Sequence, residues 1–262
     1  MDSLVIWMAP VLTALMVATM SAVGGTFVVQ RQLSFMGAGL AHAAFGGVAL
    51  GLALGLSPFL VSVPFTLGIA LLIEWIKRRS RLAPDTVIGI VFALAVAMGV
   101  LALSVSENPR ADAFSYLFGS LVTISEQHVV LVALLALGSF WVLLRQWSQW
   151  AYISFDADLA RIDGIHVRNA DLWFSLWLAL IVVIGIQVVG IILLTAFLTL
   201  PAATARLYSH QFGVMTRHSV YWALGVTLTG CVVAIVMDLP VGPTVVMFQG
   251  ITFFAVLMRR SG

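Results

Sequence analysis

The fold is decided by the stretch Leu172–Ala205, LWFSLWLALIVVIGIQVVGIILLTAFLTLPAATA, which carries no charged residue. A helix needs about 20 apolar residues to cross the hydrocarbon core of a bilayer. A stretch of about 34 residues is too long for one crossing and suits two, with a hinge expected near Gln187–Gly190. The stretch therefore predicts a protein that crosses the membrane more than once.

The rest of the chain contains further uncharged apolar stretches, at 4–29, 33–55, 59–73, 86–106, 129–144, 219–237 and 239–258. Together with the hinged stretch they predict nine crossings. Threading them alternately places all but one of the 13 lysines and arginines on one side, the exception being Arg110. Because basic residues concentrate in cytoplasmic loops, we expect a cytoplasmic C-terminus and an external N-terminus. The predicted fold class is an all-α polytopic membrane helix bundle.

Composition supports this prediction. Hydrophobic residues make up 61% of the chain and charged residues 9%, whereas about a quarter of a soluble domain is charged. The net charge of +2 suits cytoplasmic loops that face anionic lipid. No basic stretch is interleaved with aromatic stacking residues, so we expect no nucleic-acid partner. Cys231 falls inside a predicted crossing, where we expect a small packing residue. We expect one transmembrane domain over residues 1–262.

The hydrophilic segment Tyr152–Arg168 is predicted to form a short amphipathic helix on the cytoplasmic side. Its helical signals are a capping Ser154, Asp156 and Asp158 in the first turn, a later Arg161, and a terminating Gly164. Phe155, Leu159 and Ile162 share one face. This face predicts either a helix that lies on the lipid surface or one that docks onto a soluble cytoplasmic partner.

His42 is the most informative polar residue inside a predicted crossing. It follows Arg31 by about 16 Å of helix, which places it near the bilayer midplane. Small residues share its helical face, namely Ala38, Gly46, Ala49 and Ala53, and either leave room for an ion or water or permit close helix packing. The other interpretation is a hydrogen-bonded structural histidine. Neutral imidazole is a good zinc ligand, so His42 is a candidate for a transient channel ligand.

The other polar residues in or near the predicted crossings give weaker indications of function. Thr195 and Thr199 are expected to bond their own helix backbone, and Asp85 suits a helix start. Asp238 is either a turn residue or a carboxylate that attracts cations at a pore mouth. We find no nucleophile–base pair, HExxH motif or phosphate loop. An enzyme is therefore not expected.

Several stretches resemble, in order, the zinc- and manganese-type permeases of bacterial ABC importers, and in particular the high-affinity zinc uptake permease. They are Arg31–Ala43, Asp85–Ile90, Tyr116–Leu121, Gly190–Arg206 and Asp238–Pro243. The resemblance runs from about residue 10 to the C-terminus. Phe155–Ile165 also resembles the coupling helix of the related siderophore and cobalamin permeases.

The resemblance implies a homodimer in the bacterial cytoplasmic (inner) membrane, with a translocation path at or near its interface. Two cytoplasmic ABC ATPase subunits would hydrolyse ATP, and each would receive a coupling helix, here Ser154–Ile165. The residues assigned to this contact are Phe155, Asp158, Leu159, Arg161, Ile162 and Gly164. An extracytoplasmic binding protein would deliver a divalent metal as substrate, with no cofactor held permanently.

The resemblance aligns His42 with a second-helix histidine that is thought to contact metal. The family frequently has an aspartate four residues earlier, where this chain has Ala38. Ser34 is a further candidate oxygen ligand. Imidazole with few carboxylates favours zinc over manganese, and iron is a further candidate.

Two alternatives remain at this stage. An ion-coupled secondary transporter would explain nine crossings and a midplane histidine, but such a carrier usually needs buried carboxylates or basic groups. We expect none well within the crossings. An intramembrane enzyme would need paired catalytic groups at membrane depth. Changes in the segment Tyr152–Arg168, such as Gly164→Pro or Leu159→Asp, should abolish ATP-driven transport but hardly affect a secondary carrier.

Overall fold

The computed structural model describes residues 2–104 and 126–261, and every regular element in this part is helical. The predicted Arg110 exception and the motif 116–121 lie outside the described residues. The helices are α1 (Asp2–Gln30), α2 (Ser34–Ala53), α3 (Pro58–Arg79), α4 (Pro84–Ser104), α6 (Glu126–Phe155), α7 (Ala157–Ile162), α8 (Val167–Arg206), α9 (Phe212–Val236) and α10 (Val241–Ser261).

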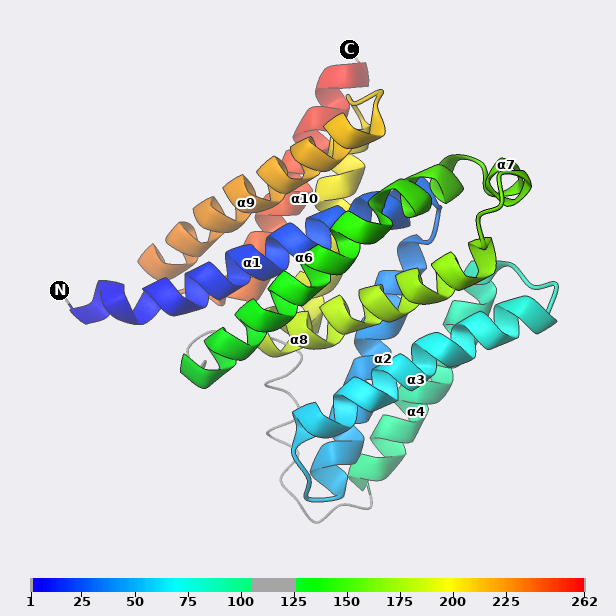
Figure 1. The fold of residues 1–262 in the computed structure, drawn as a ribbon. Coiled ribbons are helices and arrows are strands. Elements are labelled where there is room, and N and C mark those ends of the chain that lie inside the picture. Colours follow the sequence, from blue (N-terminus) through cyan, green and yellow to red (C-terminus); the bar gives the residue numbers. More distant parts are fainter. Residues whose placement is uncertain (1, 105–125, 262) are drawn as a thin grey trace.

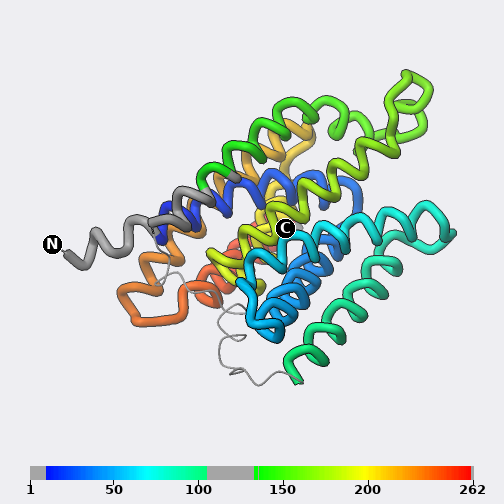
Figure 2. Tube along the Cα trace, turned by 60° about the horizontal axis from the view of Figure 1, so that its bottom comes forward, coloured from blue at the N-terminus to red at the C-terminus, as the bar shows by residue number. Residues whose placement is uncertain are grey.

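The long helices form two groups around α8 (Figure 1). On one side α1 packs against α6 and α9, and on the other α2 packs against α3 and α4. Figure 2, a turned view, shows the same separation. Helix α8 contacts members of both groups as well as α10. The predicted all-helical membrane bundle is therefore confirmed, with the longest apolar stretch at its centre.

The predicted hinge in this stretch is also confirmed. Gly190 lies within α8 with φ 79° and ψ 169°, a conformation that breaks the helix and that side-chain-bearing residues rarely adopt. A Cβ atom added to Gly185 would lie 2.4 Å from Cδ1 of Leu194. In a straight helix these two residues would be about 13 Å apart along the axis. The two segments of α8 therefore fold back on each other, as Figure 1 also shows.

Seven of the described helices are long and apolar enough to cross a membrane: α1, α2, α3, α4, α8, α9 and α10. The predicted nine crossings are reached by counting the two segments of α8 separately and adding α6. Helices α3 and α6 continue past their apolar parts, to Arg79 and Phe155. Their charged and polar last turns belong to the end of the bundle.

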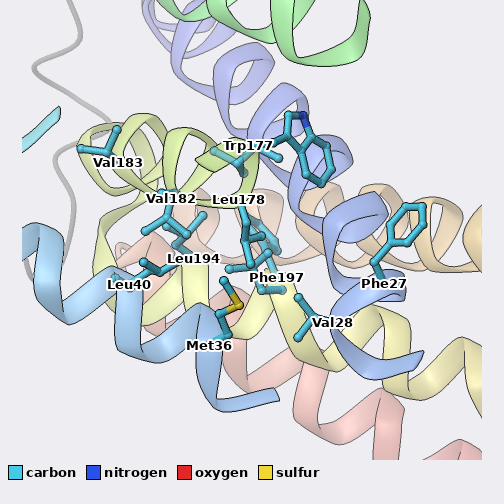
Figure 3. Packing of buried hydrophobic residues seen from close by; sticks show 14 of the residues in the cluster. Phe27, Val28, Met36, Leu40, Trp177, Leu178, Val182, Val183, Leu194 and Phe197 are labelled. Carbon is cyan, nitrogen blue, oxygen red and sulfur yellow. The ribbon is translucent and has the colours of Figure 1, made fainter. Parts of the chain in front are cut away.

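The core of the bundle forms where α1, α2 and α8 meet (Figure 3). It contains buried aliphatic and aromatic side chains, including Phe27, Val28, Met36, Leu40, Trp177, Leu178, Val182, Leu194 and Phe197. Lipid is as apolar as these side chains, so close packing rather than escape from water holds such helices together. The closest approach uses Gly25, where an added Cβ would lie 2.3 Å from the carbonyl oxygen of Leu198.

Basic residues gather at one end of the bundle. A side-chain nitrogen of Arg78 donates to the carbonyl oxygen of Arg168 over 2.7 Å, and Arg206 donates to the side chain of Gln30. Arg259 and Arg260 line a small cavity together with Tyr208 and His210. The end at which α7 lies in Figure 1 thus collects the residues that the threading placed on one side.

Candidate metal path and coupling region

His42 lies on α2, on the side that faces α4. Its Nδ1 atom is 2.9 Å from the carbonyl oxygen of Ala38, one turn earlier. Its ring meets the ring of Phe92 edge to face, with centroids 5.1 Å apart. The side chain is half-buried.

The bond to Ala38 fixes the tautomer of the imidazole. A carbonyl oxygen only accepts hydrogen bonds, so Nδ1 must donate and carries the proton. The Nε2 atom of the neutral ring then keeps its lone pair. Histidines that bind metals usually donate their second ring N–H to a carbonyl or carboxylate in this way. The side chain of Ala38 offers no metal ligand, but its backbone carbonyl oxygen orients the His42 ring.

The predicted open space along the histidine face is wrong for two of its members. An added Cβ at Gly46 would lie 2.5 Å from the carbonyl oxygen of Ala95 on α4, and Ala49 is fully buried. The small residues here serve close packing of α2 on α4. Another face of α2, which carries Gly47 and Gly51, makes a similar contact with α3, because Gly47 lies against Ser62 and Phe65. This face of α2 is thus closely packed at Gly46 and Ala49, and at His42 the ring contacts Phe92 of α4.

The other two candidate metal residues do not join His42. Ser34 is exposed and begins α2, about 12 Å along the helix from His42. Asp238 is exposed in the turn between α9 and α10, with φ 51°. Leu239 N–H donates to the carbonyl of Ala234 across this turn, 2.9 Å away, so Asp238 occupies the left-handed position that ends α9. No cluster of three or more histidine, cysteine, aspartate or glutamate side chains occurs in residues 2–104 and 126–261.

The intramembrane threonines behave as structural residues. Thr195 donates to the carbonyl of Ile192 over 2.9 Å and Thr199 to that of Thr195 over 3.0 Å. Asp85 lies in the first turn of α4, as expected of a helix start.

The coupling segment is shorter than predicted, and its cap is Asp156 rather than Ser154. Helix α6 continues through Ser154 to Phe155, so Phe155 does not belong to the short helix α7. The Asp156 carboxylate accepts hydrogen bonds from the backbone N–H groups of Asp158 and Leu159, at 3.0 and 2.9 Å. Aspartate caps as well as serine, and the Ser154 hydroxyl instead donates to the Trp150 carbonyl of its own helix at 2.6 Å and accepts from Arg31 Nε at 2.8 Å.

Gly164 ends α7 as predicted. Its φ is +84°, its N–H donates to Arg161, and the N–H of Ile165 donates to Ala160 over 2.9 Å. This pair of bonds is the Schellman arrangement, which requires a left-handed residue such as glycine.

Two apolar side chains of α7 and one at the end of α6 are exposed at this end of the bundle, and the ring of Phe155 lies 5.8 Å from that of Phe212. Ile162 is 80% exposed, and Leu159 and Phe155 are exposed as well. Asp158 and Arg161 form an ion pair of 2.5 Å on the same helix. Such a patch at the end of a bundle is typical of a contact surface.

A basic cavity of about 1200 Å³ adjoins α7. It is lined at the end of α3 by Lys77, Arg78 and Arg79 and at the start of α8 by His166, Arg168 and Asp171. This end of the molecule therefore presents an apolar helix beside a cationic hollow.

Glu74 is a buried carboxylate to which the sequence alone assigned no role. Glu74 on α3 is only 4% exposed and accepts bonds from Lys77 Nζ at 2.7 Å and Ser175 Oγ at 2.8 Å. Glu74 follows the predicted crossing 59–73 by one residue and lies near the basic end of α3, so it does not contradict the expectation that no carboxylate lies well within the crossings. The signal in the sequence was the Glu74–Lys77 spacing, because residues three apart are neighbours on a helix. Its lysine partner neutralises the charge.

Arg31 is the second residue to which the sequence analysis gave no role. It lies in the turn between α1 and α2 and is paired with Asp171 on α8 at 2.8 Å. Burial lowers the pKa of Arg31, and Asp171 counteracts this shift. A guanidinium group nevertheless stays protonated in proteins, so Arg31 keeps its positive charge.

Comparison with known proteins places the chain in a family. Residues 4–260 match the model of the ABC 3 transport family. The chain is 27% identical to the high-affinity zinc uptake system membrane protein ZnuB of Haemophilus influenzae, over 95% of this chain and 96% of that protein. It is 29% identical to the manganese transport system membrane protein MntC of Listeria innocua, over 93% of this chain and 86% of that protein.

Two solved structures share the fold. One, of PsaBC from Streptococcus pneumoniae in complex with Fab, has a chain that superposes with a TM-score of 0.82 and 28% identity, over 94% of this chain and 89% of that one. The other is an inward-facing conformation of a putative metal-chelate type ABC transporter, with a TM-score of 0.76, 18% identity, and coverage of 95% and 85%. The latter match shows that this chain and that transporter share the fold. The chain therefore belongs to the ABC 3 transport family, as a membrane permease subunit rather than as the ATPase.

Proposed function

We propose that this chain is the permease of an ATP-driven importer that carries a divalent transition metal, with zinc as the preferred substrate. The observation that carries the proposal is the family match over residues 4–260, together with relatives named for zinc and for manganese uptake. The metal is the substrate. It comes from an extracytoplasmic binding protein, and ATP is hydrolysed by separate cytoplasmic subunits.

In this proposal His42 is the transient metal ligand of the path. Its Nε2 lone pair is free because Nδ1 is held by Ala38, 2.9 Å away. A single imidazole without carboxylates binds weakly, which suits a path that must release its ion. Imidazole also suits zinc better than manganese, since manganese prefers oxygen ligands. Ser34 at the start of α2 and Asp238 at the opposite end of the bundle would be passing contacts of a moving ion.

We assign the coupling role to α7 and its flanks. The exposed side chains of Phe155, Leu159 and Ile162 would insert into a groove of the ATPase. Asp158 and Arg161 would pair with polar groups at its rim, and Gly164 would keep the helix end in place. The cationic hollow beside α7 suits an acidic part of the same ATPase subunit.

The basic end of the bundle is then the cytoplasmic end, in accordance with the positive-inside rule. This orientation puts the C-terminus in the cytoplasm of a bacterial cell, with the permease in the inner membrane. Residues 1–262 act as one permease domain. A second copy completes the path, so that two permeases face two ATPase subunits.

The test is reconstitution. The tagged chain is purified with its co-purifying proteins, placed in liposomes with its binding protein, and given ATP inside with zinc or manganese outside. Metal uptake that requires ATP and a co-purifying ATPase supports the proposal, and the ratio of the two metals decides between them. A chain that purifies alone and moves metal on an ion gradient would instead support the secondary transporter.

A further inference from the structure

We infer that Arg31 is a positioning residue that transmits movement of the coupling helix α7 to α2, the helix that carries His42. The inference rests on the proposed importer function and names the link by which the ATPase would act on the metal path. It assigns to one buried side chain the coupling between two sites that share no direct contact among the described residues.

The guanidinium group of Arg31 bonds to both arms that hold α7. On the α6 arm, Nε donates to Ser154 Oγ at 2.8 Å and Nη2 donates to the carbonyl oxygen of Trp150 at 3.0 Å. On the α8 arm, Nη1 donates to Asp171 Oδ1 at 2.8 Å. The central carbon also lies 4.5 Å from the ring centre of Phe174. All three guanidinium nitrogens are therefore engaged.

The two arms meet α7 directly. Ser154 is one residue from the end of α6, α7 spans Ala157–Ile162, and Asp171 lies in the second turn of α8. The arms are also tied to each other, because Trp150 Nε1 donates to the carbonyl of Ala170 at 3.0 Å. A displacement of α7 must therefore act on bonds that end on Arg31.

The backbone of Arg31 is fixed to the next helix. Arg31 caps α1, and Leu33 N–H donates to the carbonyl of Val28 at 2.9 Å. Between them Gln32 adopts φ 56°, which is unusual for a residue other than glycine. Helix α2 begins at Ser34, directly after this closed turn. A turn so tightly bonded moves as one body with the first residues of α2.

Helix α2 would carry the movement to the metal path. His42 lies about 12 Å along α2 from its first residue. Figure 1 shows α1 and α2 diverging from this turn toward the two helix groups. A movement of α7 would therefore act through Arg31 on the start of α2. It would rotate α2 together with α3 and α4, which pack against it.

The chemistry of arginine suits this role. The Arg31 side chain is 9% exposed, so its bonds are shielded from water and salt. Its planar fork reaches three acceptors in fixed directions, whereas a lysine is a point charge on a flexible stem. Arg31→Lys therefore keeps the charge and loses the three-way link.

The experiment measures metal uptake and ATP hydrolysis on the same proteoliposomes, containing permease, ATPase and binding protein. The variants are Arg31→Lys and Arg31→Gln. The control is Arg145→Gln, because Arg145 is an exposed arginine on α6 whose guanidinium stacks on the ring of Trp141 at 4.6 Å. Couplings between sites usually correspond to factors of about 5 to 150.

We expect the ratio of metal transported to ATP hydrolysed to fall at least about fivefold in both Arg31 variants, with ATP hydrolysis retained. Arg145→Gln should leave the ratio unchanged. If Arg31 merely supports folding, less complex assembles, both rates fall in proportion and the ratio stays constant, which overturns the inference.

Milder variants serve if Arg31→Lys fails to assemble. Ser154→Ala and Asp171→Asn each loosen one arm while leaving Arg31 in place, and each should lower the same ratio. An unchanged ratio in both would refute the link. The wild-type complex tests the proposed function separately, because absence of ATP-driven uptake there overturns the importer and the link together.

Discussion

Polar groups at the basic end of the bundle are held by several hydrogen bonds, whereas His42 in the middle is held by few. Around α7, Arg31 donates to three acceptors and Asp156 accepts two backbone bonds. In the middle, the one hydrogen bond that His42 makes to the described part of the chain is to its own helix. Coupling to an ATPase requires a fixed geometry, because a loose link would dissipate the movement. A metal path requires a weak site, because a strong one would keep the ion.

The largest effect is expected from breaking the fixed end. Leu159→Asp places a charge in the apolar contact surface of α7. Burying an unpaired carboxylate is costly, so we expect the ATPase to be lost and ATP-driven uptake to fall to background. Gly164→Pro should do the same, because proline fixes φ near −65° and this position has φ +84°. Co-purification of the ATPase measures both.

A matched control for this change lies at the opposite end of the bundle. Leu239 is 46% exposed, as is Leu159, and Leu239→Asp introduces the same charge in the turn after α9. The ATPase should still co-purify with it. Equal loss in the two variants would mean that α7 has no special role, and unchanged uptake in Leu159→Asp would favour a secondary carrier.

The packing of the middle can be broken without touching a polar group. Gly46→Ala puts a methyl group 2.5 Å from the carbonyl of Ala95. We expect the free energy of unfolding to fall by about 1–3 kcal/mol, as in other overpacked sites. The midpoint of thermal unfolding in detergent measures it.

A substitution at Gly68 is expected to change the free energy of unfolding in the opposite direction. It lies within α3, and an added Cβ there meets no atom within 4 Å. Gly68→Ala should therefore raise the free energy of unfolding by about 0.5–1 kcal/mol, since alanine is the better helix former. Similar shifts in both variants would show that α2 and α4 are not in close contact at Gly46.

Substitutions of His42 test the proposed weak metal site in the middle of the bundle. Removing its imidazole with His42→Ala should lower uptake at limiting zinc on the order of tenfold, or ~1.4 kcal/mol. ATPase co-purification should not change. His42→Gln should retain more uptake than His42→Asn, because the longer side chain places its oxygen near the position of Nε2. The reverse order would mean that Nδ1 is the ligand.

The sequence predicted the helices and the hinge because their physical causes are local. An uncharged stretch, a glycine at the break and charged turns are visible in a single chain. The end of α7 was equally predictable, since only the left-handed residue Gly164 closes it. The start was not, because Ser154 and Asp156 are both good caps and the choice depends on the bond from Arg31 to Ser154.

The missed residues share one cause. Arg31 and Glu74 looked like ordinary loop-side charges, since each stands at the edge of an apolar stretch. Their partners Asp171 and Ser175 are about 100 or more residues away, and one sequence does not pair such distant positions. The space beside His42 was misjudged for a similar reason, because Phe92 and Ala95 reach it from α4.

The smallest effect is expected when a second ligand is added beside His42, which would make the proposed metal site bind more tightly. Ala38→Asp places a carboxylate one turn before His42, and residues four apart share a helix face. Carboxylate oxygen suits manganese better than imidazole does. We expect the manganese-to-zinc uptake ratio to rise about threefold while zinc release slows. Competition uptake with both metals measures this, and Ala38→Asn, which has the same shape without charge, is the control. If both variants shift the ratio equally, the cause is the filled space beside Ala38. If neither does, the ion does not pass this turn of α2, and the metal path lies elsewhere in the bundle.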